Sequence, residues 1–280
     1  MIVVPASSAN LGPGFDVLGM ALDLHAEIDV IEPDRPVADG FEVVSKRHPA
    51  SIAHRETGGS GDVAVRSSIP SGRGLGFSGA VRVGAIALAL RDVHPGEDVL
   101  VTRRSTILDL AANLEGHADN VAASLLGGVV ITAFDDGRVI ARRIDPAPGL
   151  RIVTWVPSFR TSTDGSRAEL PIEVGRVDAV FNIARTALLV DALGRGDRAA
   201  MREATKDRLH QPVRLASNPE SAAAMARMLA SGADAAWLSG SGPTVAAVVS
   251  DEIELARISD ELPPGRVLDL RIDSIGARWR

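Results

Sequence analysis

Apolar residues recur along the chain in short runs separated by polar and glycine-rich stretches, a pattern that predicts alternating strands and helices. An opening strand leads into a glycine-rich loop at 7–14. Further strands are expected at 26–31, 63–69, 127–134 and 151–156. Helices are expected at 80–91, 106–114 and 120–126, the first of them alanine-rich and buried. Residues 47–62 are polar and glycine-rich, lack an apolar period and are expected to form a loop.

The second half continues the same alternation. Helices are expected near 176–194, 197–209, 219–231 and 252–260, and strands near 234–238, 244–249 and 266–272. Strands interleaved with helices predict an α+β fold in which helices cover one face of each sheet. The proline- and glycine-rich stretch DPAPGL suggests a boundary near residue 150, so we expect two domains, 1–150 and 151–280.

Composition narrows the function classes. The chain has 280 residues, a net charge of −6 and 3% aromatic residues, which argues against binding to nucleic acid or to anionic membranes. It contains no cysteine, which excludes disulfides and cysteine-ligated zinc and favours a cytoplasmic location. Neither a signal peptide nor an apolar run long enough to cross a membrane is expected.

Three glycine-rich loops carry the candidate chemistry. Loop one is PASSANLGPGFD (residues 5–16), loop two is PSGRGLGFSGA (70–80) and loop three is LSGSGPTV (238–245). In loop two, Gly74, Gly76 and Gly79 would let the backbone approach a ligand, and the helix that follows would direct its first N–H groups at an anion. No lysine follows any of these loops, so a Walker-type phosphate site is excluded. Taken alone, loop two or loop three could be only a tight turn, but three such loops in one chain favour a ligand site.

A segment rich in acidic residues and histidine, DLAANLEGHADN (109–120), allows two interpretations. Asp109 or Glu115 could bind Mg²⁺, because hard cations take carboxylate oxygens together with substrate phosphates. Alternatively, the segment is a solvated helix face that ends at Gly116, with His117 complementing the helix C-terminus. Spacing alone favours the second interpretation. Other polar candidates come later in the chain: Thr163, Arg167, His210 and Arg214.

The three loops in this order resemble the three motifs of the GHMP small-molecule kinases, and the likeness runs from residue 2 to about 250. Loop one together with LEGHADNVAASLLGG resembles the homoserine kinase branch of that family. The resemblance implies an N-terminal domain of the ribosomal-protein-S5 domain-2 type, a ferredoxin-like C-terminal domain, and ATP and Mg²⁺ bound between them. It also implies a homodimer.

Site residues follow from the same resemblance. Loop two would cradle the ATP phosphates and loop three would close the site, through Pro70, Arg73, Gly74, Leu75, Gly76, Phe77, Ser78, Gly79, Ala80, Ser239, Gly240, Ser241 and Gly242. The homoserine pocket would be formed by Asn10, Asp16, His117, Asn120, Thr163, Arg167 and Arg214. Within it, Asp16 would hold the ammonium group, and the two arginines the carboxylate. Asn120 stands where many members of the family have a catalytic aspartate, which implies catalysis by positioning and charge stabilisation.

Three departures from the family pattern fall on the nucleotide side. Phe77 replaces a serine in loop two, although Ser78, the expected Mg²⁺ contact, is retained. The family's Mg²⁺ glutamate falls by spacing on Asp109, which is shorter by one CH₂. The region that forms the adenine pocket is shortened to the loop at 54–62.

We therefore expect a kinase that transfers the γ-phosphoryl group of ATP to the hydroxyl of homoserine in threonine biosynthesis. Two alternatives remain open at this level. The chain could be an amino-acid-binding paralogue with impaired use of ATP and Mg²⁺, or a kinase with an altered donor or acceptor. Fold resemblance by itself does not choose among the three.

Overall fold

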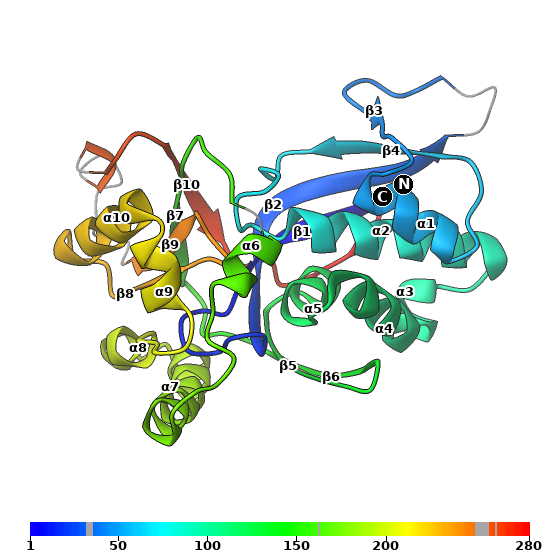
Figure 1. Ribbon diagram of the computed structural model, residues 1–280. Helices are drawn as coiled ribbons and strands as arrows, with labels where there is room; N and C mark the ends of the chain where they lie inside the picture. Colours follow the sequence, from blue (N-terminus) through cyan, green and yellow to red (C-terminus); the bar gives the residue numbers. More distant parts are fainter. Residues whose placement is uncertain (32–35, 162, 250–257, 261) are drawn as a thin grey trace.

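The computed structural model describes residues 1–31, 36–161, 163–249, 258–260 and 262–280, and in this part of the chain it contains two antiparallel sheets (Figure 1). The first sheet has the order β11–β1–β2–β4–β3, with β5 paired to β2 and β6 paired to β5. Its strands are β1 (Ile2–Ala9), β2 (Leu18–Ile31), β3 (Glu42–Val43), β4 (Asp62–Ser67), β5 (Val129–Asp135), β6 (Arg138–Ile144) and β11 (Arg278–Trp279).

Strand β2 organises this sheet because it is long enough to pair with different strands at its two ends. It runs antiparallel to β1, from Ala9 opposite Gly19 to Ile2 opposite Ile28. Its first residues pair with β5 and its last six with β4. Loop one therefore connects two paired strands, and its position relative to the sheet is fixed.

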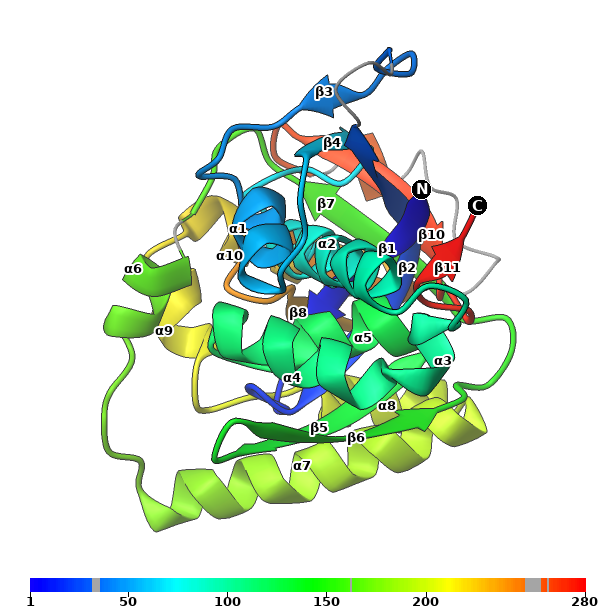
Figure 2. The same cartoon turned by 90° about the vertical axis from the view of Figure 1, so that its right-hand side faces the viewer.

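Helices cover one face of the first sheet. They are α1 (Pro49–Glu56), α2 (Phe77–Val93), α3 (Val99–Thr102), α4 (Arg104–Glu115) and α5 (Asp119–Leu126). Helices α2 and α5 pack directly on β1 and β2, and α1 and α4 flank α2 (Figure 2). At Gly84 of α2 a Cβ atom would lie 2.6 Å from Ile28 of the sheet, so this position needs glycine for the close approach. The apolar segment predicted at 80–91 is thus a buried helix.

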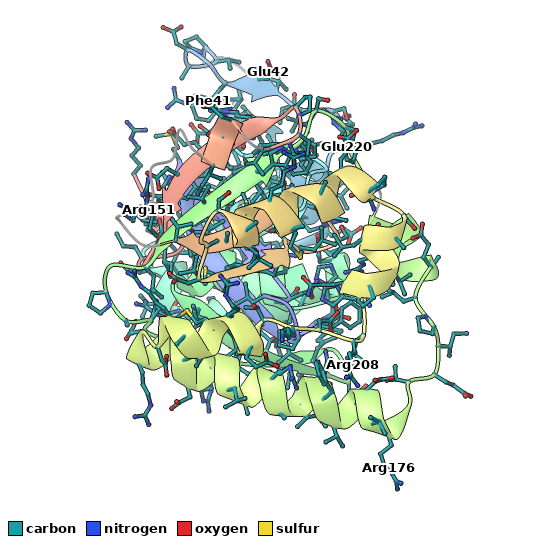
Figure 3. All side chains as sticks on the ribbon, turned by 90° about the vertical axis from the view of Figure 1, so that its left-hand side faces the viewer. Phe41, Glu42, Arg151, Arg176, Arg208 and Glu220 are labelled. Atoms are coloured by element: carbon teal, nitrogen blue, oxygen red, sulfur yellow. The ribbon has the colours of Figure 1, made fainter. Side chains whose placement is uncertain are left out.

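The second sheet has the order β10–β7–β9–β8. Its strands are β7 (Arg151–Val156), β8 (Ala235–Leu238), β9 (Val245–Val249) and β10 (Arg266–Arg271). The helices of this half are α6 (Thr163–Ala168), α7 (Arg176–Arg195), α8 (Arg198–Ala204), α9 (Gln211–Ala216) and α10 (Pro219–Ala230). Helix α10 packs on β8 and β9. The long helix α7 lies beside α8, and Arg208, which follows α8, forms an ion pair with Asp178 of α7 (Figure 3).

The predicted α+β class is confirmed, and the chain passes from the first sheet to the second between Ile144 and Arg151. The C-terminal strand β11 nevertheless returns to the first sheet, where Trp279 pairs with Ile2. The predicted division into 1–150 and 151–280 therefore does not account for β11, which follows the second sheet in the chain but pairs in the first. Within the described residues, no helix is both long and apolar enough to span a membrane.

The prediction of a loop at 47–62 is wrong, since the first part of this segment forms helix α1. Pro49 occupies the first turn and His48 caps the helix by accepting a hydrogen bond from the Ala50 N–H at 3.2 Å. The only large apolar residue of this segment is Ile52. The buried side chains of α1 are those of Ala50, Ala53 and His54, and His54 Nδ1 lies 3.2 Å from the Ala85 carbonyl oxygen of α2. Strand β6 and helix α9 are additional elements, and the helix expected at 252–260 lies largely outside the described residues.

Candidate active site

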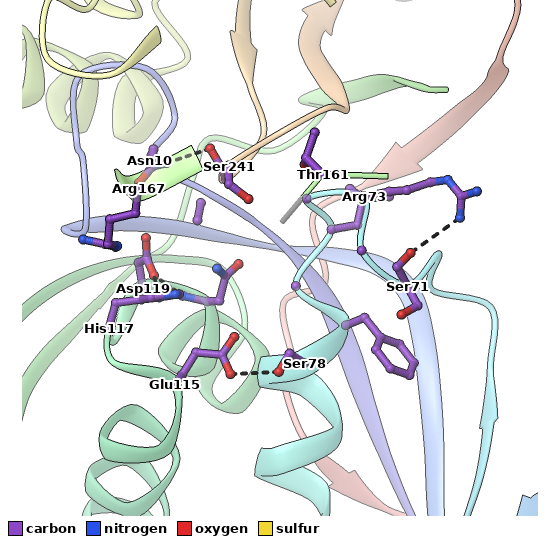
Figure 4. A pocket seen from close by; sticks show the side chains of 18 of the residues that line it. Asn10, Ser71, Arg73, Ser78, Glu115, His117, Asp119, Thr161, Arg167 and Ser241 are labelled. Carbon is purple, nitrogen blue, oxygen red and sulfur yellow. Dashed lines mark hydrogen bonds and ion pairs between the residues drawn. The ribbon is translucent and has the colours of Figure 1, made fainter. Parts of the chain in front are cut away.

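The three glycine loops meet where the two halves of the chain face each other, although they are up to 230 residues apart. The Gly240 N–H donates to the Ala9 carbonyl at 3.1 Å, and Asn10 Nδ2 donates to the Gly240 carbonyl at 2.9 Å. Ser239 Oγ donates to the Gly74 carbonyl at 2.6 Å, which joins loop three to loop two. Together the loops border a cavity of about 310 Å³ (Figure 4).

Most of the residues predicted for the site line this one cavity. They are Asn10, Asp16, Arg73, Gly74, Leu75, Gly76, Phe77, Ser78, His117, Asn120, Arg167, Arg214, Gly240 and Ser241. The loop residues Pro70, Gly79, Ala80, Ser239 and Gly242 are not in its lining. Two of these support loop two from behind, because a Cβ on Gly74 would overlap the carbonyl oxygens of Ser239 and Gly242.

Loop two ends in a helix N-terminus that points at the cavity. Gly76 is the N-cap of α2, with φ of +67°, and a Cβ there would overlap Ser7 Oγ. The first N–H groups of α2 have no partner within the helix and carry the positive end of its dipole. This arrangement suits an anion such as a phosphate without any lysine.

Arg73 was predicted to contact the nucleotide, but its guanidinium points away from the cavity (Figure 4). Its Nε donates to the Pro157 carbonyl at 2.9 Å and its Nη2 to the Ser158 carbonyl at 2.6 Å. The arginine therefore anchors loop two to the segment after β7, and only the rest of the residue borders the cavity.

Charged groups of both signs define the opposite end of the cavity. Arg167 of α6 makes two hydrogen bonds of 2.7 Å to the Asp16 carboxylate, and this pair joins the two halves of the chain. Arg214 of α9 is buried and donates to the Gly240 carbonyl at 3.2 Å. Burial lowers the pKa of Arg214, and the positive charge of Arg167 lowers it further. The ring of Phe15 lies 5.2 and 5.3 Å from the two guanidinium groups.

Helix α5 begins with Asp119, a buried residue that the sequence analysis did not select. Its Oδ1 lies 2.7 Å from His117 Nδ1 and accepts a hydrogen bond of 2.8 Å from the Asn120 N–H. Burial by itself lowers the pKa of His117, but the hydrogen bond to Asp119 and its charge outweigh burial and raise it. Asp119 thus fixes the orientation of both His117 and Asn120, whose Oδ1 also accepts from Ser7 Oγ at 2.9 Å.

The carboxylate that faces the cavity beside Ser78 is that of Glu115, and not that of Asp109, which the sequence predicted as the metal ligand. The Asp109 side chain does not line the cavity and accepts a hydrogen bond from the Val139 N–H of β6 at 2.8 Å. Six residues later on α4, Glu115 accepts a hydrogen bond of 2.9 Å from Ser78 Oγ (Figure 4). Six residues rotate a side chain to a direction about 120° away around the helix, so the two carboxylates face different surroundings.

Ser78 and Glu115 offer a hydroxyl and a carboxylate oxygen next to the helix N-terminus that suits phosphate. These are the oxygen donors that Mg²⁺ prefers when substrate phosphates supply further ligands. The described residues contain no group of three or more acidic, histidine or cysteine side chains placed to hold a metal by themselves. The residues present therefore fit a Mg²⁺ that binds together with a nucleotide.

Phe77 does not fill the cavity, because its ring packs edge-on against His48 with centroids 5.7 Å apart. His48 and Pro49, at the start of α1, line the cavity on this side together with Ser71. Burial and the charge of Arg82 lower the pKa of His48. His48 and Pro49 were missed because 47–62 was expected to be a loop, whereas Ser71 lies in loop two and was not selected. The side chain of Thr163 lies outside the described part of the structure.

The fold, the three loops and the site define a class that comparison with known families identifies. The model of the GHMP kinase N-terminal domain matches residues 44–128, and that of the GHMP kinase C-terminal domain matches residues 189–264. The chain belongs to the GHMP kinase family. The resemblance seen in the three motifs is thereby confirmed.

Within that family, the chain is similar to proteins named homoserine kinase. That of Moorella thermoacetica is 42% identical over 88% of this chain and 86% of its own length. That of Desulfitobacterium hafniense is 36% identical over 98% and 97%. Among solved structures, a homoserine kinase from Cytophaga hutchinsonii superposes with a TM-score of 0.80 over 99% of this chain and 96% of its own, at 24% identity. The mevalonate kinase of Methanococcus jannaschii shares the fold at a TM-score of 0.67 and 16% identity, over 97% and 98% of the chains.

Proposed function

We propose that this GHMP kinase is a homoserine kinase, which transfers the γ-phosphoryl group of ATP to the side-chain hydroxyl of L-homoserine. One observation carries the proposal: a single cavity joins the N-terminus of α2, which suits a phosphate, to Asp16 and Arg167, whose opposite charges suit a zwitterionic amino acid. The full-length likeness to proteins named homoserine kinase supports the same conclusion.

Asp16, Arg167 and Arg214 would bind the amino-acid backbone of the substrate. The carboxylate of homoserine suits the two guanidinium groups, and its ammonium suits Asp16. In the structure Asp16 and Arg167 are paired with each other by two hydrogen bonds. A zwitterion offers each of them a replacement partner of the correct sign, whereas an uncharged alcohol offers none.

Asn120 would position the reacting hydroxyl near the phosphate end of the cavity. Its amide is oriented by Ser7 Oγ on the side chain and by Asp119 on the backbone. Phosphoryl transfer has a loose transition state that requires little help from a strong base. We therefore expect Asn120 to position the hydroxyl and the helix N-terminus to stabilise charge, without a catalytic base.

The nucleotide would lie along loop two. Ser78 and Glu115 would hold Mg²⁺, which when bound neutralises charge on the phosphate oxygens. The wall formed by His48, Pro49, Ser71 and Phe77 offers a place for the base and ribose beyond the phosphate loop. The homodimer that the family resemblance implies stays a prediction, and light scattering on the purified protein would test it. The cytoplasmic location and the role in threonine biosynthesis stay predictions as well.

The direct test is product formation by the purified protein. We expect ³¹P NMR to show O-phosphohomoserine when Mg·ATP and L-homoserine are supplied. L-2-aminobutyrate, which lacks the hydroxyl, should give no product and should inhibit competitively. Binding of homoserine measured by calorimetry, without phosphoryl transfer, would instead support an amino-acid-binding paralogue. Transfer to another alcohol with no activity on homoserine would point to an altered acceptor.

A further inference from the structure

Arg82 lies one helical turn after Ser78 on α2 and contacts the two residues proposed to hold the metal. Its Nη1 donates to Ser78 Oγ at 2.6 Å and to Glu115 Oε2. The Arg82 and Glu115 side chains are only 16% and 13% exposed, so water screens their ion pair little. The guanidinium therefore binds the same hydroxyl and carboxylate oxygens that a divalent cation would use.

Two features of the contact make it a competitor of the metal. Arg82 is bound to Glu115 through the same oxygen, Oε2, that accepts the Ser78 hydrogen bond. A metal ion coordinated by these atoms would meet the guanidinium at close range, where like charges repel strongly in a partly buried site. In addition, Arg82 Nε is buried and has no hydrogen-bond partner among the described residues, so the arginine is incompletely satisfied where it lies.

We propose that Arg82 is an internal cation that competes with the divalent metal for Ser78 and Glu115. The metal alone must displace the guanidinium from both oxygens and therefore binds weakly. A metal that arrives with a nucleotide brings phosphate oxygens as further ligands and negative charge that offsets the arginine. Arg82 thus couples metal binding to nucleotide binding. This inference rests on the proposed function in placing a nucleotide at loop two and a metal ion at Ser78 and Glu115.

The test is a titration with Mn²⁺, followed by the electron paramagnetic resonance signal of the free ion. We expect Arg82→Met to bind Mn²⁺ alone at least tenfold more tightly than the wild-type protein. With saturating AMP-PNP the difference should shrink to less than threefold, because the nucleotide already overcomes the competition. Arg91→Met is the matched control: Arg91 lies on the same helix with its guanidinium over the ring of Trp279, and its replacement should change neither affinity.

Equal Mn²⁺ affinity in the wild-type protein and Arg82→Met would overturn the proposal, and so would weaker binding by the variant, which indicates that Arg82 supports the site. The variant Arg82→Lys guards against misfolding, because it keeps the charge and should bind Mn²⁺ alone nearly as weakly as the wild type. Neither titration contains homoserine or requires turnover. A protein that passes them yet fails to phosphorylate homoserine would disprove the proposed function and leave this inference intact.

Discussion

Two of the acidic side chains that line the cavity are held by arginines. Asp16 pairs with Arg167, and Glu115 pairs with Arg82. These pairs keep the carboxylates and guanidinium groups in fixed directions, at the cost that a ligand must replace one partner of a pair. Such a site would favour ligands that carry compensating charges, as the proposed zwitterionic amino acid and metal-bound nucleotide do.

At the residue scale, two matched substitutions on α4 can test whether Glu115 or Asp109 is the metal ligand. Glu115→Gln should lower kcat/KM for Mg·ATP by roughly a hundredfold, since one of the two proposed metal ligands loses its negative charge. Asp109→Asn should stay within about threefold of the wild type, because the amide oxygen can still accept from the Val139 N–H. Steady-state kinetics with varied Mg·ATP measure both values, and the reverse order would restore Asp109 as the ligand.

At the scale of elements, the proposed phosphate site depends on how closely α2 approaches β1. The Ser7 N–H donates to the Leu75 carbonyl at 3.2 Å, and Gly76 leaves no room for a side chain beside Ser7 Oγ. The buried face of α2 against β1 and β2 holds this end of the helix in place. The direction of its N–H groups toward the cavity is thus a consequence of packing between helix and sheet.

Two glycines with similar backbone angles allow this approach to be tested. Gly76 and Gly96 have φ of +67° and +89°, and only at Gly96 is there open space around an added Cβ. Gly96→Ala should lower the free energy of unfolding by about 1–2 kcal/mol through left-handed strain alone. Gly76→Ala should lower it by about 1–3 kcal/mol more through overlap with Ser7. Gly76→Ala should also weaken nucleotide binding. Urea denaturation measures the stability of both variants, and calorimetry measures their affinity for the nucleotide. Equal losses in the two variants would contradict the close packing.

At the scale of the whole molecule, the C-terminal segment ties the two sheets together. After β10 the chain returns to the first sheet, where the Asp273 N–H donates to the Ala21 carbonyl and the Gly128 N–H to the Asp273 carbonyl. The Asp273 carboxylate lies 2.8 Å from His25 Nε2 and accepts from Arg278 at 3.0 Å. This segment limits how far the two halves can separate, and the cavity lies between them.

The pH dependence of stability should report on this connection. Burial alone would raise the pKa of Asp273, but hydrogen bonds from His25, Gly276, Ile275 and Arg278 hold it far below its ordinary value. Because the folded pKa is depressed, the carboxylate stabilises the fold above the unfolded pKa of about 3.9, and this contribution is lost as pH falls toward the folded pKa.

Asp273→Asn should therefore lower the free energy of unfolding by about 1–3 kcal/mol at pH 7, and the deficit should shrink as the pH falls below about 4. Asp145→Asn removes an exposed carboxylate paired with Arg143 and should cost less than about 1 kcal/mol. Urea unfolding from pH 7 to pH 3 measures both. A deficit that is independent of pH would mean that the carboxylate charge does not contribute.

The sequence by itself determined the helices and strands whose apolar pattern is strong, such as α2, α7 and β9, and the three loops that line the cavity. Loop motifs are local, since glycine and small polar residues define their backbone directly. The motifs also selected Asp16, Arg167 and Arg214, which the structure places in the lining of the same cavity.

Only the tertiary structure decided which carboxylate reaches Ser78, because linear spacing cannot say which face of α4 points to the cavity. It also decided that α1 forms, since small side chains give little local signal and their packing against α2 supplies the stability. The contacts of Asp119 and Arg82 were likewise decided only by the tertiary structure. Asp119 lies inside the segment 109–120 and Arg82 lies two residues after loop two, but the linear sequence does not show that Asp119 bonds to His117 or that Arg82 reaches Glu115 on another helix.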